Sequence, residues 1–73
     1  MNNQNTSITN IDSLGDVLNA EDISNVLGIG YVKSLKLIKY GGIPHIRIGN
    51  TYRVSKSNFL TWLNQETSRV INL

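Results

Sequence analysis

The chain has 73 residues and no cysteine, so it is expected to form one small domain with a core worth only about 3–5 kcal/mol. Disulfide bonds and thiolate zinc sites are excluded. Its formal net charge is +2, yet the stretch from Ile23 to Gln65 holds six of the seven basic residues and no acid, which indicates a folded basic surface that attracts phosphate.

Residues 1–13 are largely polar, and we predict that they are disordered or loosely attached. They lack the basic start and apolar run of a signal peptide. No apolar run in the chain approaches the ~18 residues of a membrane span, so a cytoplasmic protein is expected. The predicted domain covers residues 14–65 and opens with a short leading segment of strand character at residues 14–18. Residues 66–73 are predicted to be a C-terminal tail.

A first helix, about two turns long, is predicted between Asn19 and Gly28. The side-chain oxygen of Asn19 can cap its first turn, and Asp22, three residues later, completes a capping box. Gly28 ends the helix, because glycine adopts the left-handed conformation at little cost. The apolar stripe expected on this helix is Ile23, Val26 and Leu27.

A second helix is predicted from Gly30 to about Tyr40, where two glycines stop it, and the pair forms a helix-turn-helix pattern. One side of the second helix carries Tyr31, Ser34, Leu35, Leu37 and Ile38. The other side carries Val32, Lys33, Lys36, Lys39 and Tyr40. The alternative to a binding surface is an ordinary solvated helix face. On such a face we would expect glutamates to pair with the lysines at i, i+4 spacing.

An antiparallel hairpin is predicted over residues 43–54, since Pro44 suits the start of a strand. Its turn centres on Gly49-Asn50-Thr51, and the register depends on whether the loop has two or three residues. A two-residue turn would mix apolar and basic side chains on both faces. A three-residue loop gathers four apolar side chains on one face, so we expect this register. It pairs Ile48 with Tyr52 and Ile46 with Val54, and it places Arg47 and Arg53 together on the other face.

Ser55 is predicted to cap a third helix with an inner stripe of Phe59, Trp62 and Leu63. The fold class is therefore α+β and mostly helical, a helix-turn-helix followed by a two-stranded hairpin and a C-terminal helix. Phe59, Trp62 and Tyr52 have core spacing, so we assign them to the core and not to a stacking platform for single strands.

Nothing in the sequence predicts a cofactor or a metal. His45 is the single histidine and has no Cys, Asp or Glu nearby to complete a metal site. No nucleophile–base pair, glycine-rich phosphate loop or carboxylate pair can be assembled from the residues. We therefore do not expect an enzyme.

Seven short motifs recur here in the order of a known family. They are Leu18-Asn19-Ala20-Glu21-Asp22, Leu27-Gly28-Ile29, Leu37-Ile38-Lys39, Gly42-Ile43-Pro44, Ile46-Arg47-Ile48-Gly49, Tyr52-Arg53-Val54 and Trp62-Leu63. In this order the stretch resembles the small winged helix-turn-helix domains of the excisionase family, related to the DNA-binding heads of mercury-resistance-type regulators. The chain departs from that pattern at Gly30, where serine is usual, and at Asn50 and Thr51, where the family often has basic residues.

The resemblance implies a protein that binds double-stranded DNA, bends it and assists an integrase in excising a mobile element, with cooperative self-association on the DNA. The second helix would enter the major groove, and the hairpin would act as a wing beside it. The residues expected to contact DNA are Tyr31, Val32, Lys33, Lys36, Lys39, Arg47, Asn50, Thr51 and Arg53.

Three alternatives stay open. Arg53 can instead hold the wing on the body of the domain. The same fold and surface also suit a small phage or mobile-element transcriptional regulator. From another class, the chain can be a protein-interaction module that sequesters a regulator.

Overall fold

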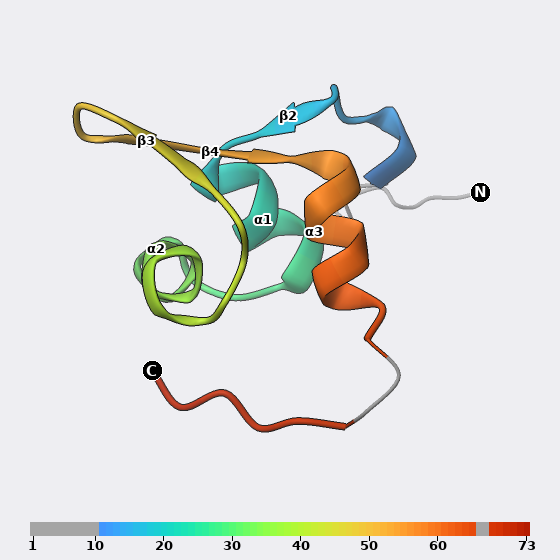
Figure 1. Ribbon diagram of the computed structural model, residues 1–73, viewed down its shortest axis with the longest axis vertical. Coiled ribbons are helices and arrows are strands. Elements are labelled where there is room, and N and C mark those ends of the chain that lie inside the picture. The colour runs from blue at the N-terminus through green and yellow to red at the C-terminus, as the bar shows by residue number, and fades with distance from the viewer. Residues whose placement is uncertain (1–10, 66–67) are drawn as a thin grey trace.

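The computed structural model describes residues 11–65 and 68–73 (Figure 1). Its elements in chain order are η1 (Ile11–Ser13), β2 (Val17–Leu18), α1 (Ala20–Leu27), α2 (Tyr31–Tyr40), β3 (Ile46–Ile48), β4 (Thr51–Ser55) and α3 (Lys56–Leu63). The α+β winged helix-turn-helix class predicted from the sequence is confirmed. The prediction of a loosely attached N-terminus falls mainly on residues 1–10, which lie outside the described residues. No helix in the described ranges is long and apolar enough to cross a membrane.

The first helix begins and ends where its capping residues predict. The backbone N–H of Asn19 donates to Asp22 Oδ2 at 2.9 Å, and the N–H of Asp22 donates to Asn19 Oδ1 at 2.7 Å, which completes the capping box. Gly28 closes α1 in the left-handed conformation, with a φ of 68°. The Ser24 hydroxyl then donates to the carbonyl of Ile29 at 2.6 Å, which fixes the turn toward α2.

The second helix is held to the first by a buried serine. Ser34 is fully buried, and its Oγ donates to the carbonyl of Ala20, the first residue of α1, at 2.6 Å. Leu37 and Ile38 are buried on the same side of α2. Tyr31, assigned to this apolar side from the sequence, is instead 54% exposed. The inner face of α2 therefore covers only its middle and last turns.

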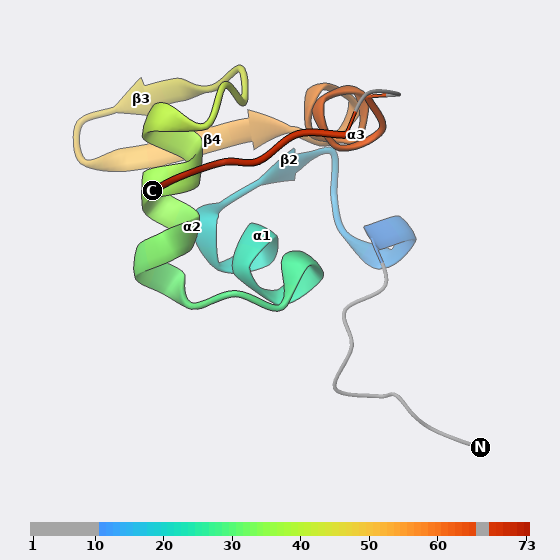
Figure 2. The same ribbon diagram turned by 90° about the horizontal axis from the view of Figure 1, so that it is seen from below.

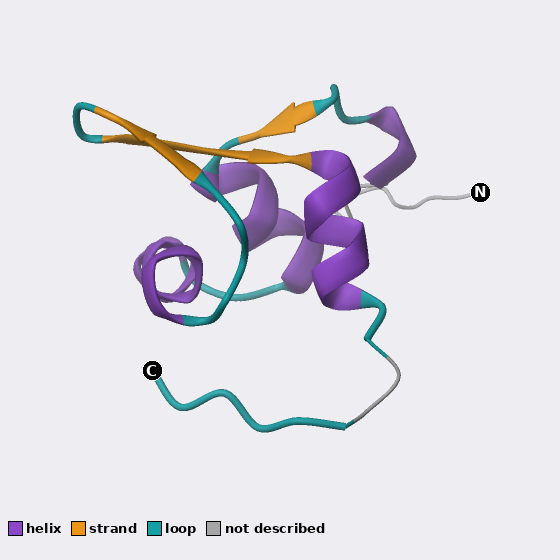
Figure 3. Ribbon diagram, viewed as in Figure 1, coloured by secondary structure: helices purple, strands orange, loops and turns teal. Residues whose placement is uncertain are grey.

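The sheet has three antiparallel strands in the order β2-β4-β3. The leading segment contributes β2, whose Leu18 pairs with Val54 of β4, and both side chains are fully buried. Strands β3 and β4 form the hairpin that extends to one side of the molecule (Figure 3). The predicted two-stranded hairpin is thus extended by a third strand, β2, which pairs with the edge of β4 opposite to β3.

The predicted hairpin register is wrong by one residue. The observed pairs are Ile46 with Arg53, Arg47 with Tyr52 and Ile48 with Thr51, around a two-residue turn at Gly49-Asn50. Since directly paired residues of antiparallel strands lie on the same face, Arg47 and Arg53 lie on opposite faces of the hairpin.

Two local causes explain this register. Gly49 has a φ of 61°, the left-handed geometry that two-residue hairpin turns require. The core is also complete without the side chains of Ile46 and Ile48, because Ile43 is buried there. Ile46 and Ile48 are each 65% exposed, so turn geometry decided the register over the burial of these two side chains.

A single apolar core lies between the sheet and the helices. Its buried members are Leu18, Ala20, Ile23, Leu37, Ile38, Ile43, Val54, Phe59 and Trp62. The hydroxyl of Ser55 accepts from the N–H of Asn58 at 3.0 Å and caps α3, as predicted. The indole N–H of Trp62 donates to the carbonyl of Gly41 at 2.9 Å, which ties α3 to the end of α2.

Residues 68–73 return from α3 toward α2 (Figure 2). Arg69 donates from Nη2 to the carbonyl of Trp62 at 2.6 Å, and its guanidinium lies 4.7 Å from the centroid of the Trp62 ring. Ile71 is half-buried against the core. The short helix η1 lies on the other side of the molecule from α2 (Figure 1).

Candidate nucleic-acid interface

One side of α2 is an exposed basic surface. Because Ser34, Leu37 and Ile38 face the core and Leu35 packs against it, the other side of the helix faces outward. The exposed residues of this helix are Tyr31, Val32, Lys33, Lys36, Lys39 and Tyr40. The three lysines recur every three residues, and the sequence offers no acid between Ile23 and Gln65 to pair with them. This surface therefore presents hydrogen-bond donors and positive charge without internal neutralisation.

The wing, defined here as residues 46–55, places its tip and one arginine beside this surface. Asn50 and Thr51 at the tip are exposed. Arg47 is held locally, since its Nε donates to the carbonyl of Gly49 at 2.8 Å and its Nη2 lies 3.5 Å from Asn50 Oδ1. Arg47 shares the face of the hairpin that carries Tyr52 and Val54, and Val54 is buried in the core. This is the face toward the helices.

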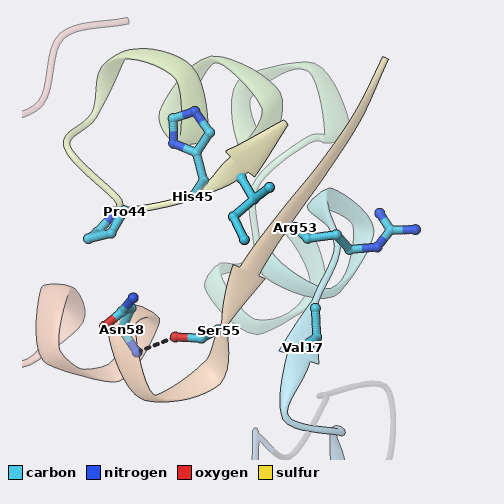
Figure 4. Close-up of a pocket in the computed structure, with 7 residues that line it drawn as sticks. Val17, Pro44, His45, Arg53, Ser55 and Asn58 are labelled. Carbon is cyan, nitrogen blue, oxygen red and sulfur yellow. Dashed lines mark hydrogen bonds between the residues drawn. The ribbon is translucent and has the colours of Figure 1, made fainter. Parts of the chain in front are cut away.

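Arg53 lies on the opposite face. Its Nη1 donates to the carbonyl of Tyr52 at 2.9 Å, and its side chain is half-buried. Figure 4 shows it at a surface hollow of 240 Å³ together with side chains from β2, the chain before β3, and α3. The hollow is lined by Val17, Pro44, His45, Ile46, Arg53, Ser55 and Asn58. The wing thus carries one arginine on each face, where the sequence predicted two on one face.

Tyr52 joins the two parts of the surface, which the sequence did not indicate. Its ring centroid lies 5.5 Å from Lys39 Nζ, 5.8 Å from the Arg47 guanidinium carbon and 5.7 Å from the His45 ring. Tyr52 is half-buried and packs against the core to which its spacing assigned it. Its position two residues before buried Val54 signals an inward side chain, but the approach of Lys39 is a tertiary contact.

The chemistry available on this surface is that of donors and cations. Nδ1 of His45 donates to the carbonyl of Ile43 at 2.8 Å, which fixes the ring beside the wing. Within residues 11–65 and 68–73 there is no group of three or more potential metal-ligating side chains. Lysine and arginine in this arrangement suit phosphate oxygens and guanine acceptors.

Most of the predicted contact residues come together. Val32, Lys33, Lys36 and Lys39 share the outer side of α2, with Tyr31 at its start, and Arg47 joins them from the wing. Asn50 and Thr51 form the tip, whereas Arg53 is separated from the group by the thickness of the hairpin.

Residues 17–67 match a protein-family model described as a helix-turn-helix domain. The match begins with β2 and includes all three α-helices and the wing. Comparison with curated proteins and with solved structures gave no match.

Proposed function

The chain belongs to the helix-turn-helix domain family, an excisionase-type family of DNA-binding domains, and from this premise we propose that it is an excisionase-like recombination directionality factor. It binds duplex DNA in the cytoplasm, bends it and assists an integrase in excising a mobile element. The observation that carries the DNA-binding part is the acid-free lysine face of α2 beside a wing with two arginines.

In the proposed complex, α2 enters the major groove, as the second helix of such motifs does. Tyr31, Val32, Lys33 and Lys36 lie nearest the base edges. Lysine donates to guanine acceptors, and Val32 suits the methyl group of thymine. Lys39, in the last turn of α2, contacts the backbone and sets the position of the helix without reading sequence.

The wing lies beside α2 with its uncharged tip toward the adjacent groove. Two phosphate strands border each groove of DNA. A hairpin with Arg47 on one face and Arg53 on the other can contact both strands, which a hairpin with both arginines on one face cannot do. The corrected register therefore supports a wing placed in the groove over one laid flat against a single strand.

The recombination role adds an integrase and further copies of the chain as partners. A single module of this kind covers roughly 600–1,000 Å² of surface, so neighbouring molecules on the DNA strengthen its binding. The decisive test is an excision assay with the cognate integrase, run with and without this protein. Unchanged excision would reject the recombination role and leave the small transcriptional regulator as the function of the same surface.

The salt dependence of binding separates both DNA roles from a protein-sequestering module. The logarithm of the association constant is expected to fall linearly with the logarithm of salt concentration, by about 0.9 for each phosphate neutralised. Fluorescence anisotropy with a labelled duplex measures this slope. A protein-sequestering module would show little DNA affinity and hardly any slope.

Lys36→Ala is expected to change the preference among DNA sites as well as the affinity. A lost base contact costs about 1–3 kcal/mol at the preferred base pair and little elsewhere. Lys39→Ala is the matched control on the same helix, since a phosphate contact weakens all sequences alike. Competition between sites that differ at single base pairs gives the readout, and an identical site ranking for both variants would contradict the assignment of Lys36.

Arg53→Ala is expected to weaken all sites about equally and to lower the salt slope by about 1, as the loss of a phosphate contact does. Arg53→Lys keeps the charge and is expected to keep the slope. Thermal unfolding is measured on both variants. A lower melting temperature with an unchanged slope would show that Arg53 supports the wing and does not contact DNA.

A further inference from the structure

We propose that Tyr52 is a positioning residue that holds Lys39 and Arg47 as a clamp on one DNA phosphate, at the junction of α2 and the wing. The proposal rests on the DNA-binding function proposed above. It assigns a shared ligand to two cations from different elements and a role to an aromatic side chain that the sequence placed in the core.

The geometry centres on one ring. Lys39 Nζ lies 5.5 Å and the Arg47 guanidinium carbon 5.8 Å from the centroid of Tyr52. Both distances are within the range of about 6 Å over which a cation is attracted to an aromatic face. Lys39 comes from the last turn of α2 and Arg47 from β3, so the Tyr52 ring on β4 contacts a cation from each of these two elements.

The two positive charges beside Tyr52 favour the binding of an anion. Two like charges held near the same ring repel each other, and the acid-free stretch from Ile23 to Gln65 provides no carboxylate from α2 or the wing to offset them. A phosphate group between the two cations removes this repulsion and gains charge-assisted hydrogen bonds with both.

The side chains of Arg47 and Lys39 also keep hydrogen-bond donors available for a ligand. Arg47 uses its Nε on the carbonyl of Gly49, which orients the guanidinium and leaves Nη1 without a partner among the described residues. Lys39 Nζ likewise has no hydrogen-bond partner within the described part of the chain. A tetrahedral phosphate oxygen can accept from each of these groups.

The test uses a labelled mixed-sequence DNA duplex, the whole chain and a series of salt concentrations. Tyr52→Leu is expected to weaken binding roughly tenfold, the combined effect of two cation–ring contacts. Tyr52→Phe retains the ring face and is expected to bind like the wild type. Thermal unfolding of both variants reports whether the fold is intact. A merely structural role of the ring would not change how Lys39 and Arg47 act together.

The number of phosphates is tested with Lys39→Ala, Arg47→Ala and the double variant, all at exposed positions. If the two cations share one phosphate, the double variant lowers the salt slope by about 0.9, whereas two separate phosphates would give about 1.8. The two single losses are expected to be non-additive in the wild type and additive in the Tyr52→Leu background.

The outcomes are separable. Absence of salt-dependent binding by the wild type would reject the DNA-binding function itself. Wild-type affinity of Tyr52→Leu at every salt concentration, or a slope change of about 1.8 in the double variant, would overturn the clamp and leave DNA binding standing.

Discussion

Replacement of Lys33, Lys36 and Lys39 together by glutamate is expected to weaken DNA binding by roughly a thousandfold, because each lost charge-assisted contact is worth about 1.5 kcal/mol or more. The new carboxylates also repel the phosphates. All three lysines are exposed on the side of α2 that faces away from the core. The variant should therefore remain folded, with circular dichroism like that of the wild type. Anisotropy with a labelled duplex measures the loss.

A matched control places negative charge on a different helix. Ser57 and Thr61 are exposed on α3, and their replacement by glutamate is expected to weaken binding only modestly, through the change in net charge. If the loss of DNA affinity for each unit of charge changed is similar in the lysine variant and the α3 variant, the loss comes from the overall net charge. The surface of α2 would then not be the interface.

Trp62→Ala is expected to leave the domain largely unfolded at room temperature. The side chain is 6% exposed, its ring stacks on Phe59 with centroids 6.0 Å apart, and its N–H donates to Gly41. Truncation of a buried Trp costs about 3–5 kcal/mol, which equals the whole stability expected of a core this small, about 3–5 kcal/mol. Circular dichroism against temperature measures the effect.

Two companion variants separate the contributions of the Trp62 ring and of its hydrogen bond to the free energy of unfolding. Trp62→Phe keeps an aromatic ring and loses the hydrogen bond to Gly41, so a cost of about 1–3 kcal/mol is expected. Leu63→Ala, at a neighbouring residue that is 37% exposed, should change stability far less. A cooperative melt of Trp62→Ala within a few degrees of the wild type would contradict the central place given to this side chain.

The local elements were predictable because each depends on nearby residues. The Asn19–Asp22 capping box, the left-handed Gly28 and the Ser55 cap fix the helix ends through contacts only a few residues apart. The lysine face of α2 followed from helical periodicity alone. Most of the proposed DNA-contacting residues could therefore be placed on their elements before the fold was known.

The arrangement of the wing was not predictable in the same way. The alternating pattern of the hairpin favoured a register that buries Ile46 and Ile48, but Ile43 and the pairing of Leu18 with Val54 complete that part of the core. Ser34, which helical periodicity placed on the apolar side of α2, donates across to the carbonyl of Ala20 in α1. Tyr52 meets Lys39 only because α2 crosses the hairpin (Figure 2). Each of these depends on contacts between distant elements.

The gathering of Lys33, Lys36 and Lys39 on one exposed side of α2 affects how the molecule would arrive at DNA. Positive charge concentrated on one side makes the charge distribution of the domain uneven, and the field of a polyanion exerts a torque on it before any contact forms. In the proposed complex this torque turns the lysine side of α2 toward the phosphates. If α2 is the interface proposed above, encounters start with it already facing the double helix, and a larger fraction of collisions leads to binding.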